Sequence, residues 1–289
     1  MKTRHAPVRR VDAAHSPSYV PSRPPTAAAA SAAQTSTGEQ DRYRAVKQYS
    51  RARTFGLWAA AAVPMGILAW VVAPWLSHHL GGREPLGEAL LILFNIGLLW
   101  ILALTLVIIS WEQGSLEWSR LRDALWLGPP QDPNSGRLGG KVWWWVVPFV
   151  VLSAAINMLP IDPAGPLVRD FPNFIPTDRA KQFYSGAWGW FALSVLVVLL
   201  SPIVEELFFR GLLLPRMRAA FGKRHWVVNG AIFAGYHLHQ PWSMPASLLD
   251  GIFAQAYPAA RYRSTWISIV THAVPSLFMV GLVLPLVLA

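Results

Sequence analysis

Five ionisable side chains lie in otherwise apolar stretches of the C-terminal part of the sequence: Glu205, Glu206, Arg210, His237 and His272. An ionisable group inside a bilayer costs at least a few kcal/mol, so each one needs a partner or a chemical task. A carboxylate beside a water can act as a general base, and histidines can orient that water or stabilise an oxyanion. The set therefore indicates acid–base chemistry at membrane depth.

Helical geometry separates the roles of the two glutamates. At 100° per residue, Glu206 and Arg210 lie about 40° apart on one helix face and can pair across a turn, whereas Glu205 points away from Arg210. Glu206 is thus predicted to be the structural carboxylate and Glu205 the free one, a candidate base. In a soluble helix the same string is usually a solvated salt-bridged face, but an apolar span supplies no solvent.

The histidines and other polar residues have simpler interpretations as well. For His237, an interhelical hydrogen bond is commoner than catalysis in membrane helices. His239 is predicted to lie at the membrane–water interface, near the end of its span. Asp250 is assigned no chemistry. A glutamate and two histidines on three separate spans are nevertheless hard to explain as unrelated packing residues.

Long uncharged runs predict the membrane-spanning helices that must position these side chains. Residues 55–76, 89–110 and 142–160 carry no charge, and each is long enough to cross roughly 30 Å of hydrocarbon at about 1.5 Å per residue. Further spans are predicted at 187–216, 226–240, 246–260 and 264–288. The long segment 187–216 is interpreted as one span kinked near Pro202; if it were split, the total would be eight rather than seven. The fold class is therefore all-α, a polytopic transmembrane helix bundle.

Basic residues set the predicted orientation and domain plan. The Lys and Arg residues gather before residue 54, at Arg216–Arg224 and at Arg261 and Arg263, which places the N-terminus in the cytoplasm and the C-terminus outside. Residues 1–54 are predicted to be a disordered basic cytoplasmic tail, 55–160 the N-terminal transmembrane helices and 187–289 the catalytic transmembrane core. The expected location is the cell membrane, plasma or inner, as a multi-pass protein.

Composition excludes several classes of partner and site. The net charge of +10 lies in the tail and the short connections, so no nucleic-acid partner is expected. Cysteine is absent, which removes disulfides, thiolate nucleophiles and cysteine metal sites. The expected partners are the lipid bilayer and a substrate that is itself membrane-associated.

The order Glu-Glu-x-x-x-Arg, Phe-x-x-x-His and a final His-x-x-x-polar motif resembles the CPBP family of intramembrane proteases, which includes the CAAX prenyl proteases and bacteriocin-processing or immunity relatives. The resemblance covers about residues 187–288, and the segment from Arg261 to Ile267 supports it. It implies that Glu205 and His237 activate water, that His272 and Ser276 bind the oxyanion, and that Glu206 and Arg210 brace the site. Ser276 departs from the usual Asn and offers one hydrogen-bond donor where an amide offers two.

Two mechanisms and two other functions remain open at this level. Glu205, His237 and His272 also form a possible zinc set, with the fourth position left for water. Metal-free activation is preferred, because no carboxylate partner for either histidine is apparent from the spacing. The predicted reaction is peptide hydrolysis in a membrane protein or a lipidated, CAAX-type peptide, near the cytoplasmic face. The alternatives are a non-catalytic scaffold or immunity-type protein of the same fold, and a transporter, for which no internal repeat is evident.

Overall fold

The computed structural model describes residues 46–289, and this part of the chain is built from helices. Residues 1–45, which hold most of the predicted tail, lie outside the described residues. Residues 46–54 were predicted to belong to the disordered tail, and this is wrong for the described part of that range, because Tyr49 is only 2% exposed and the first described helix begins at Arg51. In that helix Ser50 caps the N-terminus by accepting a 3.1 Å hydrogen bond from the Arg53 amide.

Within residues 46–289, five helical stretches are long and apolar enough to cross a membrane. They are α2–η1–α3 (Arg51–Ile67, Leu68–Val72, Ala73–Ser77), α4 (Pro85–Gln113), η2–α6 (Gly140–Trp145, Val146–Asn157), α9–η3–α10 (Trp188–Glu206, Leu207–Leu213, Leu214–Arg216) and α15 (Thr265–Leu288). The chain is therefore a multi-pass membrane protein of all-α class, as predicted.

The remaining helices are shorter and lie between these spans: α5 (Trp118–Ala124), α7 (Phe171–Phe174), α8 (Asp178–Tyr184), α11 (Arg218–Phe221), η4 (Gly222–Arg224), α12 (His225–Tyr236), η5 (His237–His239), η6 (Pro241–Ser243), α13 (Met244–Leu249), η7 (Asp250–Ala256) and α14 (Tyr257–Tyr262). The predicted spans at 226–240 and 246–260 are helical, but neither is among the five stretches. Each is interrupted, the first by a 3-10 turn at its end and the second by a π-helical segment.

The predicted span 187–216 is one continuous helical segment, so nothing divides it into two. The irregular part of this segment does not lie at Pro202, where a kink was predicted. Pro202 lies inside regular α9, whereas the π-helical turns of η3 begin at Leu207, directly after the two glutamates. A π segment commonly marks a functional site, because the extra residue per turn redirects the side chains around it.

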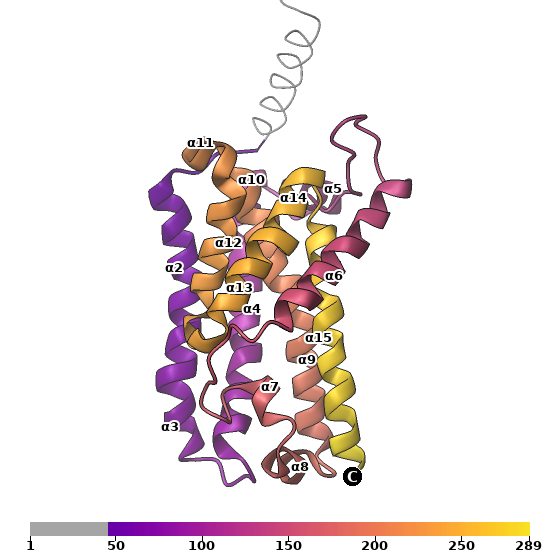
Figure 1. The fold of residues 1–289 in the computed structure, drawn as a ribbon. Coiled ribbons are helices and arrows are strands. Elements are labelled where there is room, and N and C mark those ends of the chain that lie inside the picture. Colours follow the sequence, from indigo (N-terminus) through magenta and orange to yellow (C-terminus); the bar gives the residue numbers. More distant parts are fainter. Residues whose placement is uncertain (1–45) are drawn as a thin grey trace, which may run out of the picture. The chain divides into compact units, whose positions relative to one another are not determined.

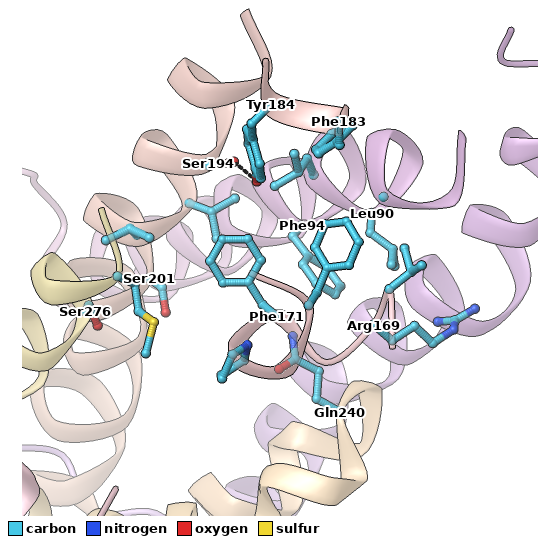
Figure 2. A pocket seen from close by; sticks show the side chains of 18 residues that line it. Leu90, Phe94, Arg169, Phe171, Phe183, Tyr184, Ser194, Ser201, Gln240 and Ser276 are labelled. Atoms are coloured by element: carbon cyan, nitrogen blue, oxygen red, sulfur yellow. Dashed lines mark hydrogen bonds between the residues drawn. The ribbon is translucent and has the colours of Figure 1, made fainter. Parts of the chain in front are cut away.

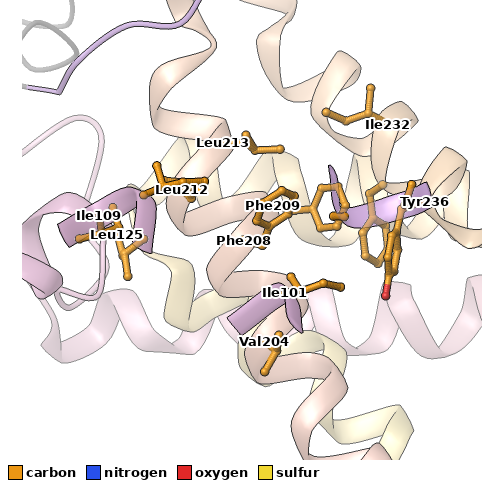
Figure 3. Packing of buried hydrophobic residues seen from close by; sticks show 14 of the residues in the cluster. Ile101, Ile109, Leu125, Val204, Phe208, Phe209, Leu212, Leu213, Ile232 and Tyr236 are labelled. Atoms are coloured by element: carbon orange, nitrogen blue, oxygen red, sulfur yellow. The ribbon is translucent and has the colours of Figure 1, made fainter. Parts of the chain in front are cut away.

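The segment α9–η3 forms the centre of the bundle, packed against α4 and α15 (Figure 1). Phe208, Phe209, Leu212 and Leu213 are fully buried, and they extend the core toward α12 and the end of α4 (Figure 3). The outer faces carry exposed apolar side chains. Trp144 is 74% exposed, which is expected where lipid rather than water covers the surface.

One end of the bundle holds the basic connection of α11 and η4, and we call it the basic end (Figure 1). A buried carboxylate ties this end together. Glu112 accepts hydrogen bonds from Arg216 Nε at 2.9 Å, Tyr49 Oη at 2.7 Å and Arg53 Nη2 at 2.9 Å. Because Arg216 ends the central segment, its charge would be costly to bury without Glu112.

Helices α12 and η7 cross closely. A Cβ added to Gly230 would lie 2.6 Å from the backbone nitrogen of Ile252, and one added to Gly251 would lie 3.2 Å from the Gly230 carbonyl oxygen. Backbone atoms cannot yield as a flexible side chain can. The absence of side chains at both positions is therefore a requirement of the packing.

Gly230→Ala is expected to destabilise the protein by about 1–3 kcal/mol, because the added methyl group overpacks the crossing. Thermal unfolding in detergent measures the effect. Gly66→Ala is the matched control, since it lies in α2 with nothing within 4 Å and its helix should gain up to roughly 1 kcal/mol. A Gly230→Ala protein as stable as the parent would contradict this account of the crossing.

Candidate functional site

The centre of the site is an ion pair across one turn of the central segment. Arg210 Nη1 donates to Glu206 Oε1 at 3.0 Å, and both side chains are completely buried. The contact predicted from the spacing of Glu206 and Arg210 is therefore present, even though η3 begins between the two residues. Its burial removes the usual alternative of a solvated surface pair.

The guanidinium of Arg210 has two further partners from other helices. Its Nη2 donates to the Gly251 carbonyl at 3.1 Å, and its Cζ lies 4.1 Å from the ring centroid of Phe233. The carbonyl is reached because Gly251 lies at the close crossing described above. The cation–π contact and the carbonyl together offset part of the cost of burying the charge.

His272 joins the same carboxylate from α15. Its Nδ1 lies 3.0 Å from Glu206 Oε1, so one oxygen is shared by the histidine and Arg210. A carboxylate can only accept, so the Nδ1 of His272 carries the proton and donates it. The Nε2 of the neutral ring then presents a lone pair, and it becomes a donor only in the doubly protonated form.

Glu205 occupies the position of the free carboxylate. It is 5% exposed, and its Oε2 has no hydrogen-bond partner among the described residues. Its electrostatic neighbours include His272, Glu206 and Arg210, and the hydroxyls of Ser201 and Tyr236 lie close enough to interact with its carboxyl group. Glu205 forms no ion pair, so its carboxyl group, unlike that of Glu206, is not committed to a cation.

His237 lies at the end of α12, where the helix tightens into a 3-10 turn. Its Nδ1 lies 3.0 Å from the Phe233 carbonyl, which fixes the Nδ1–H tautomer and leaves Nε2 as an acceptor. The Phe233 ring lies 4.8 Å from His237 and 6.1 Å from His272, centroid to centroid. Phe233 thus holds Arg210 and both histidines around one ring, while no hydrogen bond joins His237 to Glu205 in the described structure.

Ser276 lies one turn beyond His272, as predicted, but its hydroxyl donates to the His272 carbonyl at 2.9 Å. That hydrogen bond occupies its single donor proton. In this arrangement the Ser276 hydroxyl therefore has no proton left to donate to an oxyanion, because its proton is directed at a carbonyl of α15.

A cavity of about 290 Å³ adjoins the site and is lined at one side by Ser201 and Ser276 (Figure 2). Each serine is one turn from a candidate catalytic residue, Ser201 from Glu205 and Ser276 from His272. Glu205, His237 and His272 do not line this cavity.

The cavity lies toward the end of the bundle that carries α7 and α8. The residues that line the cavity include none of α10, α11 or η4, so the cavity lies away from the basic end.

Residues 187–278 match the family model described as type II CAAX prenyl endopeptidase Rce1-like. This part of the chain is similar to that family, and we call residues 187–278 the Rce1-like domain. The predicted resemblance to the CAAX proteases is thereby confirmed, and the domain indicates an endopeptidase embedded in the membrane. No curated protein and no solved structure matches the chain.

The Rce1-like domain contains all the candidate residues from Glu205 to Ser276. Its side chains do not, in this arrangement, form a zinc site: within residues 46–289, no three His, Asp or Glu residues are grouped closely enough to hold a metal ion. The predicted set of Glu205, His237 and His272 therefore does not fit a tetrahedral ion as placed here.

Two buried residues of the Rce1-like domain gain importance from the structure. His239, predicted at an interface, is 6% exposed and stacks on His237 with ring centroids 5.5 Å apart, because η5 turns the chain inward. Asp250, assigned no chemistry, is buried with Oδ1 unpartnered and lies near Arg210 and His272. The sequence did not identify Asp250 because these neighbours lie on other helices.

Glu206→Gln is expected to lower the yield of folded protein and to cost about 3–5 kcal/mol, because a neutral amide leaves the buried Arg210 charge uncompensated. The measurement is the monodisperse fraction and thermal unfolding in detergent. Glu205→Gln is the matched control at the adjacent position and should fold nearly as well as the parent, since Glu205 forms no ion pair. Equal stability of the two variants would contradict the division of roles.

Proposed function

We propose that this protein is an intramembrane endopeptidase in which Glu205 is the general base for water attack on a peptide bond. The observation that carries the proposal is the Glu205 carboxyl, which is buried beside His272 in the Rce1-like domain with one oxygen unpartnered. A carboxylate in such a setting has a lone pair available for a water proton.

His237 would orient the attacking water. Its Nδ1 is held by the Phe233 carbonyl, so Nε2 is left as an acceptor. As Glu205 takes one proton from the water, the new oxygen–carbon bond forms and the carbonyl π electrons move onto oxygen. Glu205 then returns the proton to the leaving amine when the C–N bond breaks, which balances the hydrolysis.

The negative charge of the tetrahedral intermediate needs a donor, and His272 is the candidate. Glu206 and Arg210 hold the His272 ring through the 3.0 Å contact of its Nδ1. In its doubly protonated form His272 would offer Nε2–H to the oxyanion. Ser276 would support this indirectly by holding the backbone turn that carries His272.

Zinc is the alternative source of water activation. Bound zinc would lower the pKa of a coordinated water. The donor set as placed does not group around one ion, so the residue roles above are derived without metal.

The substrate class that this arrangement favours is a membrane-associated protein with an apolar or prenylated tail. The cavity beside Ser201 and Ser276 is lined mainly by apolar side chains, which suits such a tail and disfavours a hydrated one. The basic end would face the cytoplasm of a plasma or inner membrane, which places the N-terminus there as well.

A non-catalytic scaffold or immunity-type protein of the same fold is the second candidate. The observation that favours it is the Ser276 hydroxyl, whose proton is already committed to the His272 carbonyl. An oxyanion site with one donor fewer would be weaker.

Glu205→Gln is expected to reduce cleavage of a fluorescent prenylated CAAX-type peptide by roughly 10²–10⁴-fold, because the variant keeps the shape and loses the base. Initial rates in nanodiscs measure the effect. Glu117→Gln, an exposed glutamate with 71% of its side chain accessible, is the charge-matched control and should retain full activity. Unchanged turnover in Glu205→Gln would remove Glu205 from the mechanism, and absence of cleavage in every protein would favour the non-catalytic candidate.

Chelation distinguishes the two modes of water activation. Under the metal-free proposal, dialysis against a zinc chelator leaves the cleavage rate unchanged, and the purified protein contains far less than one zinc per chain by elemental analysis. Loss of activity on chelation with recovery on adding zinc, together with about one metal per site, would instead establish the metal mechanism.

A further inference from the structure

A second pocket, of about 650 Å³, opens at the end of the bundle that carries α8, away from the basic end (Figure 1). Its walls come from the connection before α4, the first turns of α4, the end of α8 and the start of α9, and we call it the α4–α9 pocket. Two long spans begin here, α4 and α9. In a membrane this is the level at which the hydrocarbon ends and the phospholipid headgroups begin.

Glu88, in the first turns of α4, lines this pocket although the residue is only 4% exposed. Within residues 46–289, neither an ion pair nor a side-chain hydrogen bond holds its carboxylate. Glu84, one turn earlier, provides the contrast, because Arg179 Nη2 donates to its two oxygens at 2.9 and 2.7 Å. Glu88 is thus a buried carboxylate that has no cation from the described protein.

The turn before α4 is folded around the Glu88 carboxylate. A Cβ on Gly82 would overlap both Glu88 oxygens, so the absence of a side chain at Gly82 is what leaves them room. The nearby N-terminus of α4 favours negative charge through the helix dipole. The dipole supplies no counter-ion, however, and the carboxylate stays available to a cationic group in the pocket.

Arg83 is the second charged side chain in the wall of the α4–α9 pocket. Its Nη1 donates to the carbonyls of Gln182 at 3.1 Å and Ser185 at 2.7 Å, which fixes the guanidinium at the end of α8. No carboxylate pairs with it in the described part of the chain. The pocket therefore offers a carboxylate to a cation and a guanidinium to an anion.

Aromatic rings form much of the remaining wall, from Phe183, Trp188 and Trp190. Such rings attract cations by their faces, and tryptophan at the start of a span is typical of the headgroup level. Leu196 and Leu199 follow along α9 and are exposed, so an apolar surface continues from the pocket toward the hydrocarbon. A ligand that matches both parts has a zwitterionic head and apolar tails.

We propose that the α4–α9 pocket binds the headgroup of phosphatidylethanolamine, with the ammonium at Glu88 and the phosphate at Arg83. An ammonium donates N–H hydrogen bonds to a carboxylate, and a guanidinium donates to phosphate oxygens. The acyl chains would lie on the exposed apolar face of α9. This lipid site is separate from the candidate catalytic residues, because none of Glu205, His237 and His272 lines the pocket.

The bound lipid would also support the wall of the neighbouring cavity. Phe183 lines both the α4–α9 pocket and the cavity of Figure 2. A headgroup that joins the start of α4 to the end of α8 would hold this ring between the two spaces. Binding to the folded protein alone raises its stability, so the lipid should raise the unfolding temperature.

The test uses the full chain, purified in detergent and stripped of lipid. The probes are phosphatidylethanolamine and phosphatidylglycerol with identical acyl chains, since both carry the phosphate and only the first carries an ammonium. Native mass spectrometry measures their binding and thermal unfolding measures the stabilisation. Phosphatidylethanolamine should bind as one molecule per chain, at least about tenfold tighter than phosphatidylglycerol, as expected for a hydrogen bond between charged groups.

Glu88→Gln should remove the preference, because the amide keeps the shape and loses the charge. Glu117→Gln, at an exposed glutamate outside the pocket, is the matched control and should leave it unchanged. Arg83→Gln should weaken both lipids and keep the preference, because the phosphate is common to them. Gly82→Ala tests the same site without changing a charge: its Cβ would displace the Glu88 carboxylate, so the preference should fall.

Equal affinity for the two lipids in the parent protein, or a preference that survives in both Glu88→Gln and Gly82→Ala, would overturn the inference. Soluble phosphoethanolamine that stabilises the protein as much as the whole lipid would identify a soluble zwitterion as the ligand. Stabilisation by Mg²⁺ or Ca²⁺ alone, lost in Glu88→Gln and unaffected by Arg83→Gln, would identify a metal site. Either result would exclude the lipid assignment.

Discussion

The buried charge of Arg210 constrains the structure of the whole C-terminal domain. A guanidinium without solvent requires a counter-charge and acceptors for its donors, and these come from three other places in the chain: Glu206, the Gly251 carbonyl and the Phe233 ring. Because these partners belong to different helices, compensation of the Arg210 charge requires that η3, η7 and α12 pack together. The same carboxylate oxygen then holds His272, so the position of a candidate catalytic ring follows from the compensation of one charge.

Glycines and π-helical turns make this compensation possible. Gly230 and Gly251 let α12 and η7 approach closely enough for a backbone carbonyl to reach Arg210, and η3 redirects the residues after Glu206. The close packing of α12 and η7 excludes residues larger than glycine at these two positions, because a Cβ at the crossing would meet backbone atoms. The Glu205 carboxyl remains outside the pairing, as a base requires.

The two ends of the bundle have different physical characters. At the basic end, Glu112 neutralises Arg216 and joins the chain before α2 to the end of the central segment. Toward α7 and α8, the bundle instead leaves an apolar cavity with Arg169 uncompensated in the described structure. At the basic end, charge is thus paired inside the protein, whereas the cavity wall holds an arginine with no carboxylate partner among the described residues.

Local features of this protein were readable from its sequence, and long-range ones were not. Uncharged runs predicted three of the five long spans, and the apolar segments 187–216 and 264–288 predicted the other two. The i to i+4 spacing predicted the Glu206–Arg210 pair, and the ordered motifs predicted the resemblance to the protease family. Each of these features depends on residues close together in the chain or on composition. The tertiary structure alone decided that His272 binds Glu206, that His239 is buried and that Arg169 faces the cavity. These contacts join residues on different helices, and helix packing rather than spacing brings them together.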